Sequence, residues 1–141
     1  MTASYAVRCR CGAQAFALPG PPPRVTICFC RDCQRRAGGP FGLATYYPEE
    51  GLDLPVLPTW RRRADSGRWL ETSACPSCGV VLYQRFERRP GVVGIPLGLV
   101  DGARDTPPDR AVFCVNKPAW VQLPDGIEAY VAGSDGPRWT G

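Results

Sequence analysis

The chain has 141 residues, of which 44% are hydrophobic and 10% are aromatic, so it can bury the core of a single domain spanning 1–141 and is not a disordered chain. It contains 16 glycines, 16 prolines and no histidine, which indicates a turn-rich fold and excludes imidazole as a base, an acid or a metal ligand. The formal charge of +4 treats eight cysteines as neutral. Metal-bound thiolates would bring the charge to about +1, so a nucleic-acid partner is not expected.

Neither a targeting segment nor a membrane span is expected. Residues 1–7 contain neither a basic region nor an apolar run, so they do not read as a signal peptide. No stretch of the chain approaches the ~18 apolar residues that a membrane helix needs. We therefore expect a cytoplasmic protein, and in a reducing compartment clustered cysteines are more often metal ligands or catalytic groups than disulfides.

Short strands are predicted at the start of the chain. Residues 5–12 are strand-like and run into a turn, and residues 13–18 alternate as the partner strand of a hairpin. The proline-rich segment 19–23 cannot donate to a ladder and is predicted to be a loop within the domain. Residues 25–28 are rich in β-branched side chains and are predicted to form the next strand.

One short helix is predicted over residues 31–37, because Gly38 and Gly39 follow it with Pro40 beyond, a typical helix end. We expect a mainly β fold with short antiparallel sheets and one or two short helices, closed by a turn-rich tail. Further strand character is predicted in residues 41–47, in a basic run from Trp60 that is interrupted at 65–67, and in residues 80–86, 91–100 and 111–115.

Two cysteine pairs that are far apart in the sequence predict one closed metal site. Cys75 and Cys78 have the C-x-x-C spacing that lets the backbone curl so that both sulfurs face one ion. Cys9 and Cys11 form a tighter half-site, and both can reach one ion only if the backbone turns there, which Gly12 permits. Four thiolates complete a tetrahedron, so we expect a structural zinc that ties the first hairpin to the middle of the chain.

The central trio of Cys28, Cys30 and Cys33 is one ligand short of a closed site. A zinc with three protein ligands and an open fourth position is the arrangement of catalytic sites, so we predict two zinc ions per chain and place the functional site here. Arg35 and Arg36 follow on the same helix and are candidates to hold a substrate carboxylate. A solvated helix face is the alternative interpretation of these arginines.

Other interpretations of the cysteines remain open at this point. Cys114 lies in the predicted strand 111–115, where it is either a small buried core residue or a fourth ligand that closes the trio. Eight cysteines could also form four disulfides, although bridges between C-x-C neighbours are strained. Four arginines are predicted to be exposed charge, with an anion-binding patch as the alternative: Arg61, Arg62, Arg63 and Arg68.

With these residues assembled, the chain resembles the glutathione-dependent formaldehyde-activating enzyme/centromere protein V family. The similarity covers about residues 5–130 and rests on the ordered set of seven cysteines. It also includes residues 34–41 after the trio, Gly79, residues 98–101 and residues 117–125.

The resemblance implies a β-rich, tent-like fold of the Mss4-like type. It implies a structural zinc on Cys9, Cys11, Cys75 and Cys78, and a second zinc on Cys28, Cys30 and Cys33. The reaction of the family joins glutathione and formaldehyde into S-hydroxymethylglutathione and is classed as carbon–sulfur lyase chemistry. Phe29 stands where members commonly carry histidine, so a polar neighbour of the trio is replaced by an aromatic one.

We therefore predict a zinc-dependent enzyme of carbon–sulfur lyase type that acts on a small-molecule thiol such as glutathione and on an aldehyde. The thiol would bind zinc as a thiolate and attack the aldehyde carbon, with water or a carboxylate such as Asp32 moving the proton. Two other functions remain open. One is a non-catalytic zinc-stapled binding module, and the other is a thiol-reactive zinc or redox sensor.

Overall fold

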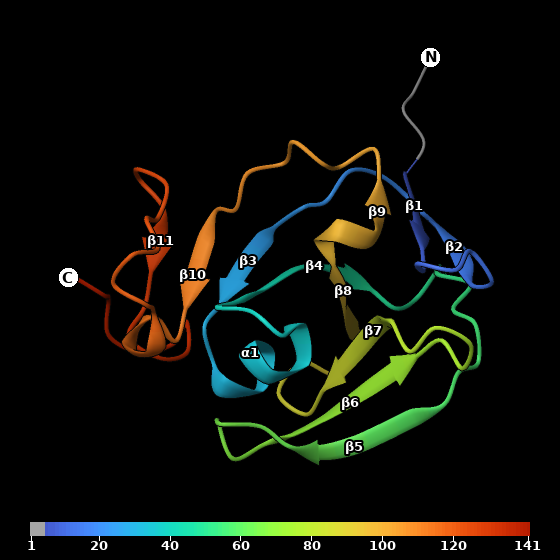
Figure 1. The fold of residues 1–141 in the computed structure, drawn as a ribbon, viewed down its shortest axis with the longest axis horizontal. Coiled ribbons are helices and arrows are strands. Elements are labelled where there is room, and N and C mark those ends of the chain that lie inside the picture. Colours follow the sequence, from blue (N-terminus) through green and yellow to red (C-terminus); the bar gives the residue numbers. More distant parts are fainter. Residues whose placement is uncertain (1–4) are drawn as a thin grey trace.

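Two β-sheets form the framework of the computed structural model, which describes residues 5–141 (Figure 1). Residues 1–4 of the stretch in which no signal peptide is expected lie outside this range. The smaller sheet has the order β2-β1-β9, built from Tyr5–Arg8 (β1), Ala15–Leu18 (β2) and Val100–Asp101 (β9). β1 and β2 form the predicted hairpin, in which Tyr5 lies opposite Leu18.

The larger sheet has eight strands in the order β11-β10-β3-β4-β8-β7-β6-β5, and it curves around the single α-helix of the described residues (Figure 1). Its strands are β3 (Val25–Cys28), β4 (Gly42–Pro48), β5 (Thr59–Arg63), β6 (Trp69–Ala74), β7 (Val81–Phe86), β8 (Val92–Pro96), β10 (Arg110–Val112) and β11 (Glu128–Ala129). The helix α1 spans Arg31–Ala37, and two 3-10 helices, η1 (Leu97–Leu99) and η2 (Cys114–Asn116), follow β8 and β10.

The expected fold class is confirmed: the protein is mainly β, and most neighbouring strands are antiparallel. Two pairings at one end of the larger sheet are parallel, because β10 lies beside both β3 and β11 in the same direction. The long connection from β9 to β10 returns the chain to the starting end of β3, which a tight hairpin could not do.

Two predicted strands are shorter than expected. The strand predicted over residues 91–100 ends at Pro96, and η1 then redirects the chain so that β9 pairs with β1 in the other sheet. The strand predicted over residues 111–115 ends at Val112, because Phe113 adopts the left-handed region with φ of 56°. A ladder cannot continue through that conformation, and the chain enters η2 instead.

Hydrophobic side chains gather in two clusters. The larger cluster joins the smaller sheet to β7 and β8, and Val7, Leu82, Val93 and Ile95 are fully buried in it. The smaller cluster lies around β3 and β10 and contains Ile27, Phe29, Ala111 and Cys114. Among the described residues, none of the helices is long and apolar enough to cross a membrane.

Candidate metal centres and the pocket beside them

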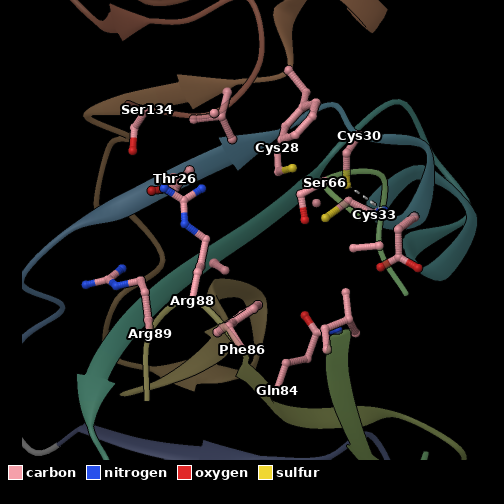
Figure 2. A pocket seen from close by; sticks show the side chains of 18 of the residues that line it. Thr26, Cys28, Cys30, Cys33, Ser66, Gln84, Phe86, Arg88, Arg89 and Ser134 are labelled. Atoms are coloured by element: carbon pink, nitrogen blue, oxygen red, sulfur yellow. Dashed lines mark hydrogen bonds between the residues drawn. The ribbon is translucent and has the colours of Figure 1, made fainter. Parts of the chain in front are cut away.

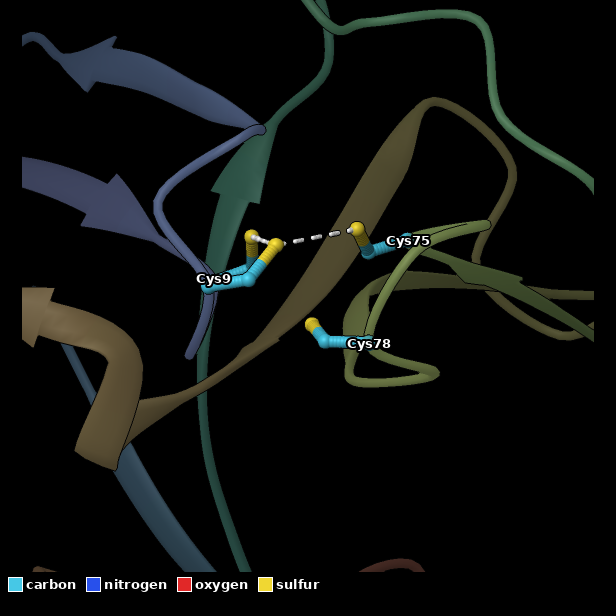
Figure 3. Close-up of side chains that lie close together, drawn as sticks. Cys9, Cys75 and Cys78 are labelled. Atoms are coloured by element: carbon cyan, nitrogen blue, oxygen red, sulfur yellow. Dashed lines mark hydrogen bonds between the residues drawn. The ribbon is translucent and has the colours of Figure 1, made fainter.

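The outer cysteine pairs meet at one point between the two sheets (Figure 3). The Sγ atoms of Cys9, Cys11, Cys75 and Cys78 all lie within 4.8 Å of one another. Cys9 Sγ is 3.6 Å from Cys11 Sγ, which in turn is 3.8 Å from Cys75 Sγ. The backbone turns after β1, as predicted, because Gly12 has φ of 80° and its N–H donates to the Cys9 carbonyl at 3.1 Å.

These distances fit a tetrahedral zinc. Four sulfurs that each lie about 2.3 Å from one ion are about 3.8 Å apart, close to the separations found between Cys9, Cys11 and Cys75. Burial raises the pKa of the Cys9 thiol, but hydrogen bonds from the Gln14 N–H and from the neighbouring thiols outweigh it and lower that pKa to about 6. A backbone hydrogen bond at Ala13 lowers the pKa of Cys11, but its hydrogen bonds with the other three thiols outweigh it and raise that pKa to about 11. The thiolate is the form of cysteine that binds metal, and a lowered pKa favours this form.

The central trio forms the second group of thiols. The Sγ atoms of Cys28, Cys30 and Cys33 lie within 4.8 Å of one another, and in the described part of the chain no other histidine, cysteine or carboxylate completes the group. Cys28 is the last residue of β3, Cys30 is the N-cap of α1, and Cys33 lies in the first turn of that helix. The Cys33 N–H donates to Cys30 Sγ at 3.3 Å, which fixes the two thiols relative to each other.

The helix that carries the trio has the predicted bounds. Gly38 follows it in the left-handed conformation with φ of 69°, and its N–H donates to the Gln34 carbonyl at 2.8 Å. This C-cap ends α1 after only seven residues.

Arg36 places a positive charge directly beside the trio. A Cβ on Gly42 of β4 would lie 2.8 Å from Arg36 Nη2 and 3.1 Å from Cys33 Cβ, so glycine is needed for this close packing. Hydrogen bonds with Cys28 and Cys30, followed by the Arg36 guanidinium, outweigh burial and lower the pKa of the Cys33 thiol, whereas the contacts with the other two thiols raise the pKa of Cys28. The hydrogen bond with Cys28 lowers the pKa of Cys30, but the contact with Cys33 and burial outweigh it and raise that pKa. Arg36 Nε is buried without a hydrogen-bond partner among the described residues.

The trio opens into a cavity of about 390 Å³ (Figure 2). Cys28, Cys30 and Cys33 lie at one end, and Thr26, Gln84 and Phe86 contribute to its walls. Three arginines and the C-terminal segment supply further lining that sequence reasoning did not select: Arg88, Arg89, Arg110, Gly133 and Ser134. Arg88 and Arg89 had a local signal in the sequence, since they form a basic pair before the turn at Pro90 and Gly91.

The turn between β5 and β6 forms one wall of the cavity through Ala64 and Ser66. It is tied to the start of α1, because the Arg31 N–H donates to Asp65 Oδ2 at 2.8 Å. Arg62 makes an ion pair with the buried carboxylate of Asp32, which also lines the cavity. Arg61, Arg62, Arg63 and Arg68 are all exposed as predicted, but Arg62 also contacts the site through its ion pair with Asp32.

The two arginines predicted to hold substrate have different surroundings. Arg36 lines the cavity, but Arg35 is exposed and does not line it. Phe29 is fully buried in the smaller core cluster, where its ring packs edge-on against Phe41 at a centroid distance of 5.8 Å. Cys114 is buried in the same cluster and belongs to neither group of thiols, so the structure favours the core interpretation of this residue.

Comparison with known proteins gave one family. The family model described as glutathione-dependent formaldehyde-activating enzyme matches residues 4–116, which include all the cysteines of both thiol groups. The match ends before the C-terminal segment that supplies Gly133 and Ser134 to the cavity. A search of curated proteins returned no match.

Proposed function

Because the chain belongs to the glutathione-dependent formaldehyde-activating enzyme family, we propose that it is a zinc-dependent enzyme of carbon–sulfur lyase type. It joins the thiol of glutathione, or of a similar small thiol, to formaldehyde or another aldehyde. The observation that carries this proposal is the trio of thiols at the end of a cavity of about 390 Å³, with no fourth ligand from the described residues. A cavity of this size accommodates a small-molecule substrate.

The two thiol groups are assigned different roles. Cys9, Cys11, Cys75 and Cys78 hold a structural zinc, because four thiolates leave no coordination position free. Cys28, Cys30 and Cys33 hold a second zinc, which supplies an open position that favours a substrate thiol in its thiolate form. The proposal includes a cytoplasmic location, where free thiols persist.

The residues around the trio support addition of a thiol to an aldehyde. The sulfur electron pair forms a bond to the carbonyl carbon, the carbonyl π bond breaks, and the proton released by the thiol ends on the aldehyde oxygen. Arg36 offsets the negative charge of the thiolates beside Cys33. The Asp32 carboxylate is already held by Arg62, which leaves water as the proton carrier in the cavity.

Native mass spectrometry and exchange NMR test this proposal together. We expect two zinc ions per chain, one fewer in Cys30→Ser, and the full number in Cys114→Ser, the matched control outside both thiol groups. Magnetisation exchange between formaldehyde and S-hydroxymethylglutathione should accelerate with the wild type and with Cys114→Ser, but not with Cys30→Ser.

A protein that holds two zinc ions and leaves the exchange rate unchanged would contradict the enzymatic proposal. Release of the second zinc on mild oxidation, with no effect on the exchange rate, would indicate the redox-sensor alternative instead.

A further inference from the structure

The end of the cavity that faces away from the thiols is positively charged. Four arginines line the cavity: Arg36 lies beside Cys33, and the other three are Arg88, Arg89 and Arg110. Figure 2 shows the Arg88 and Arg89 side chains on the left of the view, below Ser134, whereas Cys30 and Cys33 lie on the right. The cavity therefore has a sulfur end and a guanidinium end.

Three of these arginines already have a partner for their charge. Arg36 lies beside Cys33, since a Cβ on Gly42 would meet both side chains. Arg110 lies 3.8 Å from a carboxylate oxygen of Glu128, and Arg88 lies 3.5 Å from one of Asp135.

Arg89 differs from the other three. Its guanidinium lies 5.1 Å from the centre of the Tyr46 ring, which orients it, and no carboxylate of the described residues is within ion-pair distance. Tyr46 also lines the cavity. Arg89 is exposed to solvent and, of the four arginines that line the cavity, is the one with no charged partner among the described residues.

The C-terminal segment holds the guanidinium end in a defined shape. The Phe113 and Val115 N–H groups donate to the carbonyls of Ala132 (2.9 Å) and Val131 (3.2 Å), which anchors the segment to η2. A Cβ on Gly133 would meet Asp135 Oδ1 at 3.0 Å and Arg88 Nη1 at 3.3 Å, so the segment and the arginine are in close contact. Ser134 adds a hydroxyl group to this wall.

We propose that Arg89, assisted by Arg88 and Ser134, forms a carboxylate subsite that selects thiol substrates carrying an acid group distant from the sulfur. This inference rests on the function proposed above. A guanidinium binds a carboxylate through paired N–H donors, and Arg88 and the Ser134 hydroxyl can add further donors from the same lining. Under the proposed function Arg36 offsets the zinc-bound thiolates at the sulfur end, so an anionic group of the substrate is favoured at the opposite end, which orients the substrate thiol toward the trio.

Calorimetric titration of the zinc-loaded protein with three probes tests the subsite. Glutathione carries both the thiol and the carboxylates, its diethyl ester keeps the thiol alone, and S-methylglutathione keeps the carboxylates alone. The variants are Arg89→Gln, Arg88→Gln and the control Arg104→Gln, which removes the same charge from a side chain 93% exposed in the loop before β10.

We expect the wild type and Arg104→Gln to bind glutathione at least about tenfold more tightly than the diethyl ester, as one charge-assisted contact allows. Arg89→Gln should bring this ratio close to one while leaving the affinity for the ester unchanged. Arg88→Gln should lower the ratio by a smaller factor, because Asp135 already shares that charge.

Binding of S-methylglutathione tests the carboxylate subsite independently of the reaction with formaldehyde. Its affinity should fall about tenfold in Arg89→Gln even if no reaction with formaldehyde is found, because this probe has no free thiol. The subsite would be overturned if the affinity for S-methylglutathione did not depend on Arg89, or if none of the probes bound. It would also be overturned if Arg89→Gln lowered the affinities for glutathione and for its ester equally. A loss in Arg88→Gln without one in Arg89→Gln would overturn the assignment to Arg89.

Discussion

Replacing Cys75 and Cys78, which lie between β6 and β7, should destabilise the protein far more than replacing two cysteines of the trio. The four-thiol group connects distant parts of the chain, since 64 residues separate Cys11 from Cys75. Cys28 and Cys33, by contrast, lie in one local segment at the end of β3 and the start of α1. The double variant Cys75→Ser with Cys78→Ser releases the long loop that zinc closes between Cys11 and Cys75. The double variant Cys28→Ser with Cys30→Ser releases only the short loop between Cys28 and Cys33.

The expected difference follows from the entropy of loop closure. A cross-link that closes a loop of 64 residues restricts the unfolded chain by about 4 kcal/mol, whereas one that closes a loop of about six residues contributes about 2 kcal/mol. The whole free energy of unfolding of a domain is about 5–15 kcal/mol, so the first loss is large. For a chain of 141 residues these values correspond to falls in Tm of roughly 15 °C and 7 °C.

Thermal unfolding of the zinc-loaded variants, followed by circular dichroism, measures both falls. The two double variants remove the same number of thiols, and serine at position 30 can still cap α1, so the comparison isolates the length of the loop. Each variant should also bind one zinc fewer. Equal falls in Tm, or a larger fall in the trio variant, would refute the assignment of the four-thiol group as the structural site.

Two further predictions concern the core and the pH dependence of stability. Phe29→His should lower the free energy of unfolding by about 2 kcal/mol in urea titrations, because it places a polar ring in a fully buried site, and it should leave the formaldehyde exchange rate unchanged. A changed exchange rate at unchanged stability would mean that residue 29 faces the cavity. Arg85 donates to Glu49 at 2.7 and 2.9 Å and lowers the pKa of that carboxyl below 4.5, so the stabilisation is complete above pH 4.5 and is lost as the pH falls below it. The difference in urea midpoint between wild type and Arg85→Gln should therefore shrink below pH 4.5, and a constant difference would contradict this assignment.

Much of the candidate metal chemistry was predictable from local spacing. The C-x-C and C-x-x-C spacings at Cys9, Cys28 and Cys75 let two or three neighbouring thiols face one ion, whatever the rest of the fold does. The helix over residues 31–37 was predictable for the same reason, since its ends depend on glycines directly beside it. The β-rich class followed from composition and from the alternating segments.

The surroundings of the trio were not predictable in this way. Arg35 and Arg36 are neighbours on one helix, and only the packing of α1 against β4 decides that Arg36 faces the cavity. Phe29 directly precedes Cys30, yet its ring lies in the core. In both cases the side chain's direction depends on which elements pack around it.

The amino-acid sequence by itself indicated which cysteines form local half-sites, because ligand spacing is a property of a few consecutive residues, but it left Cys114 open as a fourth ligand of the trio. The structure places Cys114 in the core cluster and in neither thiol group. Only the tertiary structure decided what faces the trio. The cavity is assembled from β3, α1, the β5–β6 turn, the β7–β8 turn and the C-terminal segment, and Arg89 and Ser134 reach it from positions 45 residues apart. Such a juxtaposition depends on strand pairing and on the parallel placement of β10, which local patterns do not encode.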